Sequence, residues 1–489
     1  MRIHLRAIFS SLVAMFVCAI HLPNLLAQPS LDVVVTSEPP TDEEDPGGFP
    51  IKFFDNYSWR LFVALNWPAA QGQRGKPDTS KTLGDITTQV DGKTVTIPRT
   101  WETWKSVEEL FLPDGKEPTE WQAFDVSTVC PEQAAGRDAT TKTLIGFTKL
   151  GNTLADLNQV DDIGFPIGPL IARNRSYVRY EIRMNETEYQ FIRNNKYYRR
   201  ENFPKAGEAP IAFSNGSIEV KAAWREFKLP EERDLVDRYY HTEAWAFNPA
   251  TNKCEKKEFG LVGFHIAQKT PTRRQWIWST FEHVDNLSVG STAPAGTEST
   301  FDPTGPVNGD IPPPQPITSS NGPKDNPDPV KLARQHVNTT QFSSIPPPQT
   351  REANDEWHIN PKIKGTVWEN YDLIMTQWPI QQNAPDNNFS PFPSSNVANV
   401  TMETYVQSNS CITCHQPTTN NTDFVWFLSI RSFPPLNGGG GGPGLAVSHA
   451  AAIRKTNAEV VRNAARKAFE AAKNAAGKTM PKFPGENNQ

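Results

Sequence analysis

The sequence predicts an α+β fold: a loop-rich body with an antiparallel β-meander, followed by a small, mainly helical C-terminal segment. Three observations support this class. The 489 residues include 43 prolines, which interrupt helices, and helix-period runs are scarce before residue 445. Thirteen tryptophans and 27 phenylalanines supply an aromatic core. Several short runs between residues 216 and 284 alternate apolar and polar side chains, as half-buried strands do.

The first 50 residues are expected to lie outside the folded body. Residues 1–27 read as a signal peptide, with two arginines before the apolar stretch Ala7–Ile20 and a cleavage site after Ala27. Retention as an anchor is the alternative, although the stretch is shorter than the about 20 residues that span a bilayer. Residues 28–50 form an acidic, flexible lead-in. No later segment is apolar enough to span a membrane, so we expect a periplasmic or secreted protein.

Residues 51–285 form the aromatic-rich α+β body. Its first predicted element is a helix over Asp55–Asn66, which ends before Pro68 and has Asp55 or Asn56 as its N-cap. Residues 177–200 fit either a strand that runs into a helix or one long helix.

The strongest strand signals follow and predict the antiparallel meander. They are Ser217–Phe227, Tyr239–Phe247, Phe259–Gln268 and Gln275–Phe281.

The second half of the chain divides by composition. Residues 286–350, rich in Pro, Ser and Thr, read as a loop or linker. A haem-binding segment packed on the body is expected over 351–435, with a strand at Gly365–Trp378. A glycine-rich tether (436–444) and an Ala-rich helix and tail (445–489) complete the chain.

Residues 411–415 (CITCH) match the attachment motif for one covalent haem c. The thiols of Cys411 and Cys414 each form a thioether with one porphyrin vinyl group, and His415 becomes the proximal iron ligand. A zinc site is the competing interpretation of C-x-x-C, but no second Cys/His pair stands at suitable spacing. The motif alone leaves an electron carrier, a haem enzyme and a haem sensor open.

The remaining cysteines fit an oxidising compartment. Cys18 leaves with the signal peptide, which leaves Cys130 and Cys254 as one candidate disulfide. Two buried thiols are the alternative. Haem c is joined to protein outside the bacterial cytoplasm, so the motif and the signal peptide support each other.

The sixth iron ligand decides the chemistry of such a haem. Met480 is the first candidate, because it stands in a Met-Pro segment at a distance from His415 that suits small cytochromes. An open position is also considered, as are six other side chains: Met402, Met375, His265, His283, His358 and His449.

Some of these residues also have structural interpretations. His265 lies in a predicted strand and reads as a structural histidine whose ring nitrogens have hydrogen-bond partners. His283, between acids, reads as a surface residue or as a base or ligand. Thr401 with Thr404 or Glu403 is expected to start a short helix that presents the two cysteines on one side. The apolar run Asp423–Leu428 is expected to be a haem wall or ordinary core.

The net charge of −5, with no long basic run, does not suggest nucleic-acid binding. The sequence therefore predicts an exported monohaem cytochrome that exchanges single electrons with a periplasmic partner. The alternative is a haem-dependent oxidoreductase, ligand-binding protein or sensor whose large body binds a small molecule.

Gly260–Asn286 and Thr401–Leu428, with the D-F-x-x-x-L tail after the motif, carry a family resemblance. The chain resembles large, exported bacterial monohaem "cytochrome c family" proteins of undefined physiological role, over about residues 50–433. The resemblance implies haem c, export and a redox association, and no known substrate. The glycine tether and the C-terminal helix look like an addition to that pattern.

Overall fold

The structure is a computed structural model. It describes residues 31–43, 50–123, 142–144, 170, 172–174, 176, 178–248, 253–287, 299–301, 348–383, 391–393, 399–403, 410–416 and 422–433. Several predicted features lie outside the described residues: the signal peptide, Cys130, the glycine tether, His449, Met480 and the C-terminal helix.

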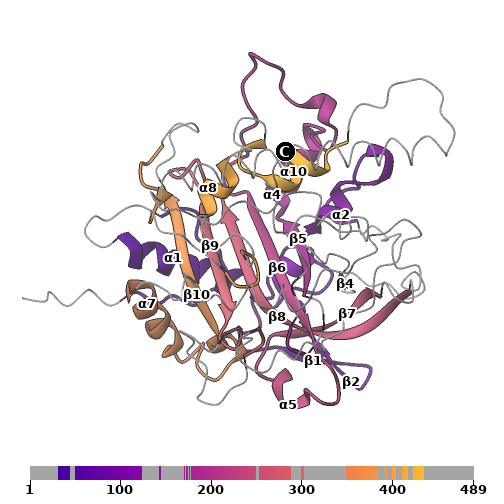
Figure 1. Ribbon diagram of the computed structural model, residues 1–489, viewed down its shortest axis with the longest axis vertical. Helices are drawn as coiled ribbons and strands as arrows, with labels where there is room; N and C mark the ends of the chain where they lie inside the picture. The colour runs from indigo at the N-terminus through magenta and orange to yellow at the C-terminus, as the bar shows by residue number, and fades with distance from the viewer. Residues whose placement is uncertain are drawn as a thin grey trace, which may run out of the picture.

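A nine-stranded sheet forms the centre of the molecule (Figure 1). Its strands are β3 (Lys105–Ser106), β4 (Lys142–Leu144), β5 (Arg179–Met184), β6 (Ile218–Glu226), β7 (His241–Asn248), β8 (Lys253–Gln268), β9 (Ile277–His283), β10 (Tyr371–Pro379) and β11 (Pro391–Phe392). The order is β11-β10-β9-β8-β6-β5-β3, and β7 pairs with the first half of β8 and with β4. Every pairing is antiparallel except that of β4 with β7. The predicted α+β class is therefore confirmed.

Short helices surround this sheet, and a two-stranded hairpin stands apart from it. The helices are α1 (Pro50–Leu65), α2 (Val107–Leu110), α4 (Glu186–Asn194), α5 (Arg233–Val236), α7 (Pro348–His358), α8 (Cys411–His415) and α10 (Trp426–Arg431). Turns of 3₁₀ helix are η1 (Thr100–Thr103), η2 (Pro113–Gly115), η4 (Arg200–Asn202) and η6 (Val367–Asn370). The hairpin pairs β1 (Thr87–Val90) with β2 (Lys93–Thr96). In the described part of the chain, no helix has the length and apolar character needed to cross a bilayer.

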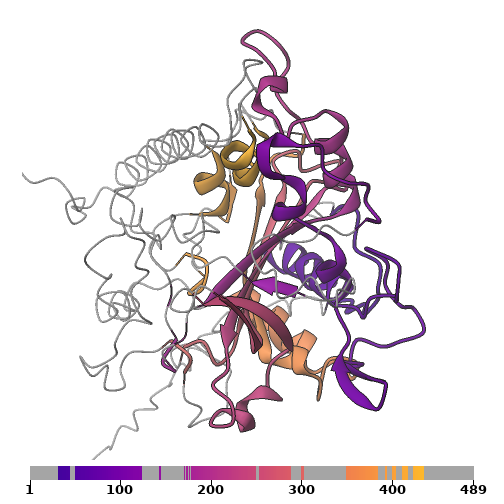
Figure 2. The same cartoon turned by 90° about the vertical axis from the view of Figure 1, so that its right-hand side faces the viewer.

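The helices divide between the two faces of the sheet. Figure 2 shows α1 and α7 on one side and α8 and α10 on the other. On the α1 face, the Ser58 hydroxyl lies 2.7 Å from those of Ser279 in β9 and Thr376 in β10. Phe62 of α1 stacks on Phe281 of β9 at 4.2 Å. This face carries most of the aromatic core, so the opposite face is the one available to residues 411–415.

The N-terminal region differs from the prediction in two ways. Helix α1 begins at Pro50, whose missing N–H suits a first helical position, so neither Asp55 nor Asn56 caps it. Asp55 is instead buried inside the helix. The expected flexible lead-in is packed against the body over residues 31–43. There Val35 is buried, and the Pro40 carbonyl accepts a hydrogen bond from the Gln268 amide at 2.8 Å.

Most of the remaining elements lie where the sequence predicts them. Residues 177–200 contain β5 followed by α4, so the prediction of a strand that runs into a helix is confirmed. The Asn185 side chain caps α4 by accepting a hydrogen bond from the Glu188 amide. The four strands predicted between residues 217 and 281 correspond to β6 to β9, but they do not form the expected meander, because β6 and β7 each pair with a different half of β8 and not with each other. The strand expected from Gly365 begins only at Tyr371, because η6 precedes it.

Candidate functional site

The five motif residues form the short helix α8, which docks on the end of β10. The buried Ile412 anchors it, and its amide donates to Gln377 Oε1 at 2.9 Å. Cys411 and Cys414 are half-buried thiols three positions apart, so they lie on one side of the helix. The expectation that the cysteines share one side is confirmed. The helix that presents them begins at Cys411 itself, and residues 404–409 before it lie outside the described residues.

The imidazole of His415 is oriented by a backbone carbonyl. Its Nδ1 lies 2.7 Å from the Phe424 oxygen. A carbonyl oxygen only accepts, so Nδ1 carries the proton and the ring lone pair is on Nε2. Metal-bound histidines usually donate their second nitrogen in this way, which fixes the tautomer and raises the basicity of the ligand. The Trp278 ring of β9 packs against the imidazole, with centroids 4.4 Å apart.

A tight turn presents the Phe424 carbonyl to His415. The Val425 amide donates to the Thr422 carbonyl at 2.9 Å, and the two central residues, Asp423 and Phe424, have φ of 49° and 71°. Positive φ at both central positions defines a type I′ turn, which ordinarily takes Asn-Gly. A bulky aromatic residue in this region is unusual and marks local strain.

The apolar run after this turn belongs to the core. Phe424, Val425, Phe427 and Leu428 are all buried within the main aromatic cluster. The Trp426 indole donates to the Cys414 carbonyl at 3.2 Å, which joins the start of α10 to the end of α8. The core interpretation of Asp423–Leu428 is therefore confirmed, and its role as a haem wall stays a prediction.

The sheet face beneath α8 can be followed through the strand register. Trp278 pairs with Gln377, and two residues further on Thr280 pairs with both Met375 in β10 and His265 in β8. Side chains of paired residues, and of residues two apart, point to the same face. Two candidate sixth ligands, Met375 and His265, therefore lie on the face that supports α8.

Of the other described candidates, Met402 belongs to segment 399–403, which contacts His265 on the same sheet face, whereas His358 ends α7 on the other face (Figure 2). Met402 is buried in a second apolar cluster with Val262 and Val400. His358, at the end of α7, has its Nε2 2.9 Å from the Tyr371 carbonyl oxygen. The register and these contacts do not place either of them next to α8.

The surface interpretation of His283 is wrong. Its ring is fully buried and stacks on Tyr239 at 3.7 Å. Nε2 lies 3.0 Å from the Arg238 carbonyl oxygen, and Nδ1 accepts from the Asp285 amide at 3.1 Å. Burial lowers the pKa of His283 to about 4. The acidic neighbours in the sequence suggested exposure, but the ring is in fact enclosed and neutral.

His265 lies in β8 as expected, next to an acid that sequence reasoning had not linked to it. Its Nε2 is 3.4 Å from Glu403 Oε2, and both side chains are partly exposed. Segment 399–403 approaches the sheet closely here, because a Cβ at Gly263 would lie 1.9 Å from Thr401 Oγ1. Burial raises the pKa of the nearby Glu282 to about 8, although its carboxylate accepts from the Val400 amide at 2.5 Å.

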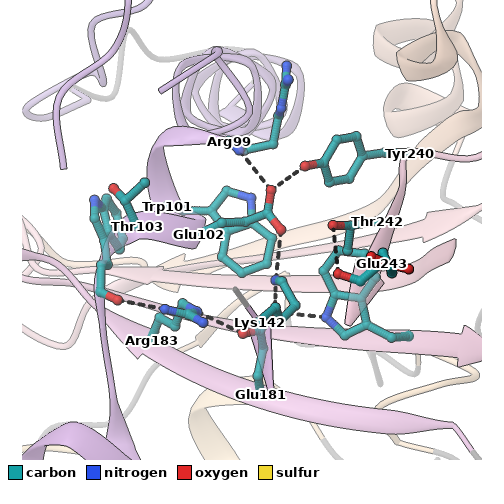
Figure 3. Close-up of polar contacts among 12 residues, drawn as sticks. Arg99, Trp101, Glu102, Thr103, Lys142, Glu181, Arg183, Tyr240, Thr242 and Glu243 are labelled. Carbon is teal, nitrogen blue, oxygen red and sulfur yellow. Dashed lines mark hydrogen bonds and ion pairs between the residues drawn. The ribbon is translucent and has the colours of Figure 1, made fainter. Parts of the chain in front are cut away.

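A buried ion cluster that the sequence did not reveal lies on the opposite face (Figure 3). Lys142 of β4 contacts the carboxylates of Glu102 (2.7 Å) and Glu181. Its ammonium also lies 4.8 Å from the ring centroid of Trp101 and 4.3 Å from that of Trp224. The carboxylates have further partners, which makes the cluster a balanced internal network.

Among the described residues, no group of three or more His, Cys, Asp or Glu side chains is arranged to hold a metal ion, so the zinc interpretation gains no support there. Cys254 is buried in β8, and its candidate partner Cys130 lies outside the described residues, so the disulfide stays a prediction. The chain matches no protein-family model, no curated protein and no solved structure.

Proposed function

We propose that the chain is an exported monohaem c-type cytochrome that transfers single electrons to or from a periplasmic partner. The observation that carries the proposal is the contact between His415 Nδ1 and the Phe424 carbonyl, within a C-x-x-C-H helix. Histidines that ligate a metal usually donate their other ring nitrogen in this way. His283 and His358 also approach backbone carbonyls, so the contact supports ligation only in combination with the two cysteines of the motif.

Each motif residue has a defined part in this proposal. Cys411 and Cys414 would hold the porphyrin through two thioethers, and His415 would ligate the iron. When bound, the haem supplies a one-electron couple. Phe424 keeps the proton on Nδ1, and Trp278 packs against the imidazole. The buried run from Phe424 to Leu428 excludes water from this side, which favours the reduced state.

The proposed partner is a redox protein or a small molecule, and the proposed compartment is the periplasm. The signal-like N-terminus supports the compartment. The partial exposure of both thiols and of His415 supports a partner that reaches the site from solvent. A porphyrin held by these partly exposed thiols would be within reach of a partner. The resemblance to exported monohaem proteins agrees with this proposal.

Covalent haem is the direct test. The purified protein, expressed with a haem c maturation system, should retain haem staining on a denaturing gel and contain one haem per chain by pyridine haemochrome. Cys411→Ala with Cys414→Ala should abolish the staining. Lys256→Met, which removes an exposed ion pair of β8, is the control and should keep it. Staining that survives the double substitution would reject the proposal.

A second candidate is a haem-dependent oxidoreductase or sensor. The His265–Glu403 pair favours it, because a partly exposed acid–base pair lies on the sheet face that supports α8. Carbon monoxide binding to the reduced protein separates the two candidates. An electron carrier with both axial positions filled should bind it poorly, whereas an open haem should bind it readily.

A further inference from the structure

We propose that Asp423 and Lys269 are positioning residues for the proximal histidine. Their buried ion pair holds the turn at 422–425, and the turn aims the Phe424 carbonyl at His415. The inference rests on the proposed function, because it assigns these residues a role only if His415 ligates haem iron.

The turn needs to be held from outside. Asp423 and Phe424 both adopt positive φ, at 49° and 71°, where a residue with a side chain is rarely found. Such conformations persist only where the surroundings enforce them. The Thr422 hydroxyl contributes by donating to the Val425 carbonyl at 2.8 Å, but this bond lies within the turn itself.

Three residues from two segments outside the turn converge on Asp423. The Lys269 ammonium, just past β8, forms an ion pair with Oδ2, and the Phe213 amide donates to the same oxygen at 2.7 Å. The indole of Trp276, before β9, donates to the Asp423 carbonyl at 3.1 Å. The side chains of Lys269 and Asp423 are 5% and 1% exposed, so water does not screen the pair.

The consequence reaches the iron through the imidazole. A firm Nδ1–H···O=C bond raises the basicity of the ligand and stabilises the oxidised iron. If the pair is lost, the turn can relax toward commoner backbone angles and the Phe424 carbonyl can swing away from Nδ1. We therefore expect the reduction potential to rise when the pair is removed.

Charge alone can also change a potential, so the test uses a charge-neutral exchange. The double variant Asp423→Asn with Lys269→Met removes one negative and one positive charge. We expect haem content to stay at one per chain and the midpoint potential to rise. Loss of a hydrogen bond of ordinary net strength shifts the reduced-to-oxidised ratio by up to about tenfold. For a one-electron couple a tenfold change equals about 59 mV.

Two comparisons complete the experiment. Lys269→Arg keeps the cation and should keep the wild-type potential. The comparison exchange Asp285→Asn with Arg238→Met removes another ion pair of a buried carboxylate, with a partly exposed arginine and contacts of 2.6 and 2.8 Å, just past the opposite end of β9. This control should leave the potential unchanged. Electron paramagnetic resonance of the oxidised protein should show altered g-values, which depend on the imidazole plane, only in the Asp423/Lys269 variant.

The outcomes are distinguishable. Wild-type protein without covalent haem would refute the proposed function itself. Haem-loaded protein with the same potential and g-values in the double variant would overturn the positioning role and leave the proposed function standing. If the double variant does not fold, Trp276→Phe decides, because it removes the indole donor to the Asp423 carbonyl and changes no charge. A measured rise in the potential supports the positioning role of the turn, and an unchanged or lower potential overturns it.

Discussion

At the scale of single residues, the core contains acids that burial keeps protonated. Asp55 lies inside α1 with no exposed surface, and desolvation raises the pKa of its carboxyl to about 7, although the Thr350 and Thr376 hydroxyls oppose the shift. The folded chain therefore retains this proton up to about pH 7, whereas the unfolded chain releases it near pH 3.8. The stability contributed by Asp55 is lost as the pH rises through this window.

Asp55→Asn should stabilise the protein more at pH 8 than at pH 5, because asparagine resembles the protonated acid and never ionises. From the two pKa values, the advantage should grow by about 2 to 3 kcal/mol between these pH values. Urea unfolding of both proteins at each pH measures this difference. Thr88→Val, in the exposed hairpin, removes no ionisable group and is the control, so its effect should not depend on pH. A pH-independent effect of Asp55→Asn would contradict the assignment.

At the scale of elements, the ion cluster around Lys142 explains how β4 is held on the sheet. This strand has only three residues and pairs in parallel with β7. The carboxylates that receive its ammonium are fixed by other elements: Glu102 accepts from the Arg99 amide at 2.7 Å, and Glu181 accepts from the Trp224 indole at 2.9 Å. Residues of η1, β5 and β6 thus form the binding site for the Lys142 ammonium, and Lys142 is the one side chain of β4 that enters it.

Lys142→Met should destabilise the fold by about 3 to 5 kcal/mol, because it leaves two buried carboxylates without their shared cation. Chemical denaturation measures the loss. Lys256→Met is the matched control, since Lys256 forms an exposed pair with Glu243 at 2.8 Å and should change stability by less than about 1 kcal/mol. Equal effects of the two substitutions would show that the cluster does not hold β4.

Local patterns predicted some elements and not others. Strands β6 to β9 were predictable, because their side chains alternate and turn residues separate them. Strand β4 was not, since three residues carry no period and its stability comes from partners distant in the sequence. The start of α1 was misjudged because Asp55 looks like an N-cap, and its burial depends on Thr350 and Thr376, about 300 residues away.

At the scale of the whole molecule, the candidate site combines one local signal with several distant ones. The thiols and the imidazole were predictable because residues 411–415 are contiguous. Their supports, Gln377, Trp278 and the Phe424 carbonyl, come from β10, β9 and a turn, and their residue types carry no haem signature. The sequence alone thus suggested the proposed haem chemistry, whereas the surfaces that orient the thiols and the imidazole could be found only from the fold.

The same arrangement implies that the sheet folds without haem. Helices α1 and α7 close the aromatic core on one face, whereas α8 docks at one end of the other, with Ile412 as its buried residue (Figures 1 and 2). In the Cys411→Ala/Cys414→Ala variant, amides of β6, β8 and β9 should therefore keep their protection from hydrogen exchange. Amides of α8 and residues 422–433 should exchange faster, because local segments open independently of the core.

Mass spectrometry measures hydrogen exchange in both regions by comparing the variant with haem-loaded protein. Wild-type chain produced without haem maturation is the control for the substitutions. Protection lost uniformly across the sheet would mean that the haem is needed to form the core, and the separation of sheet and site would then be wrong.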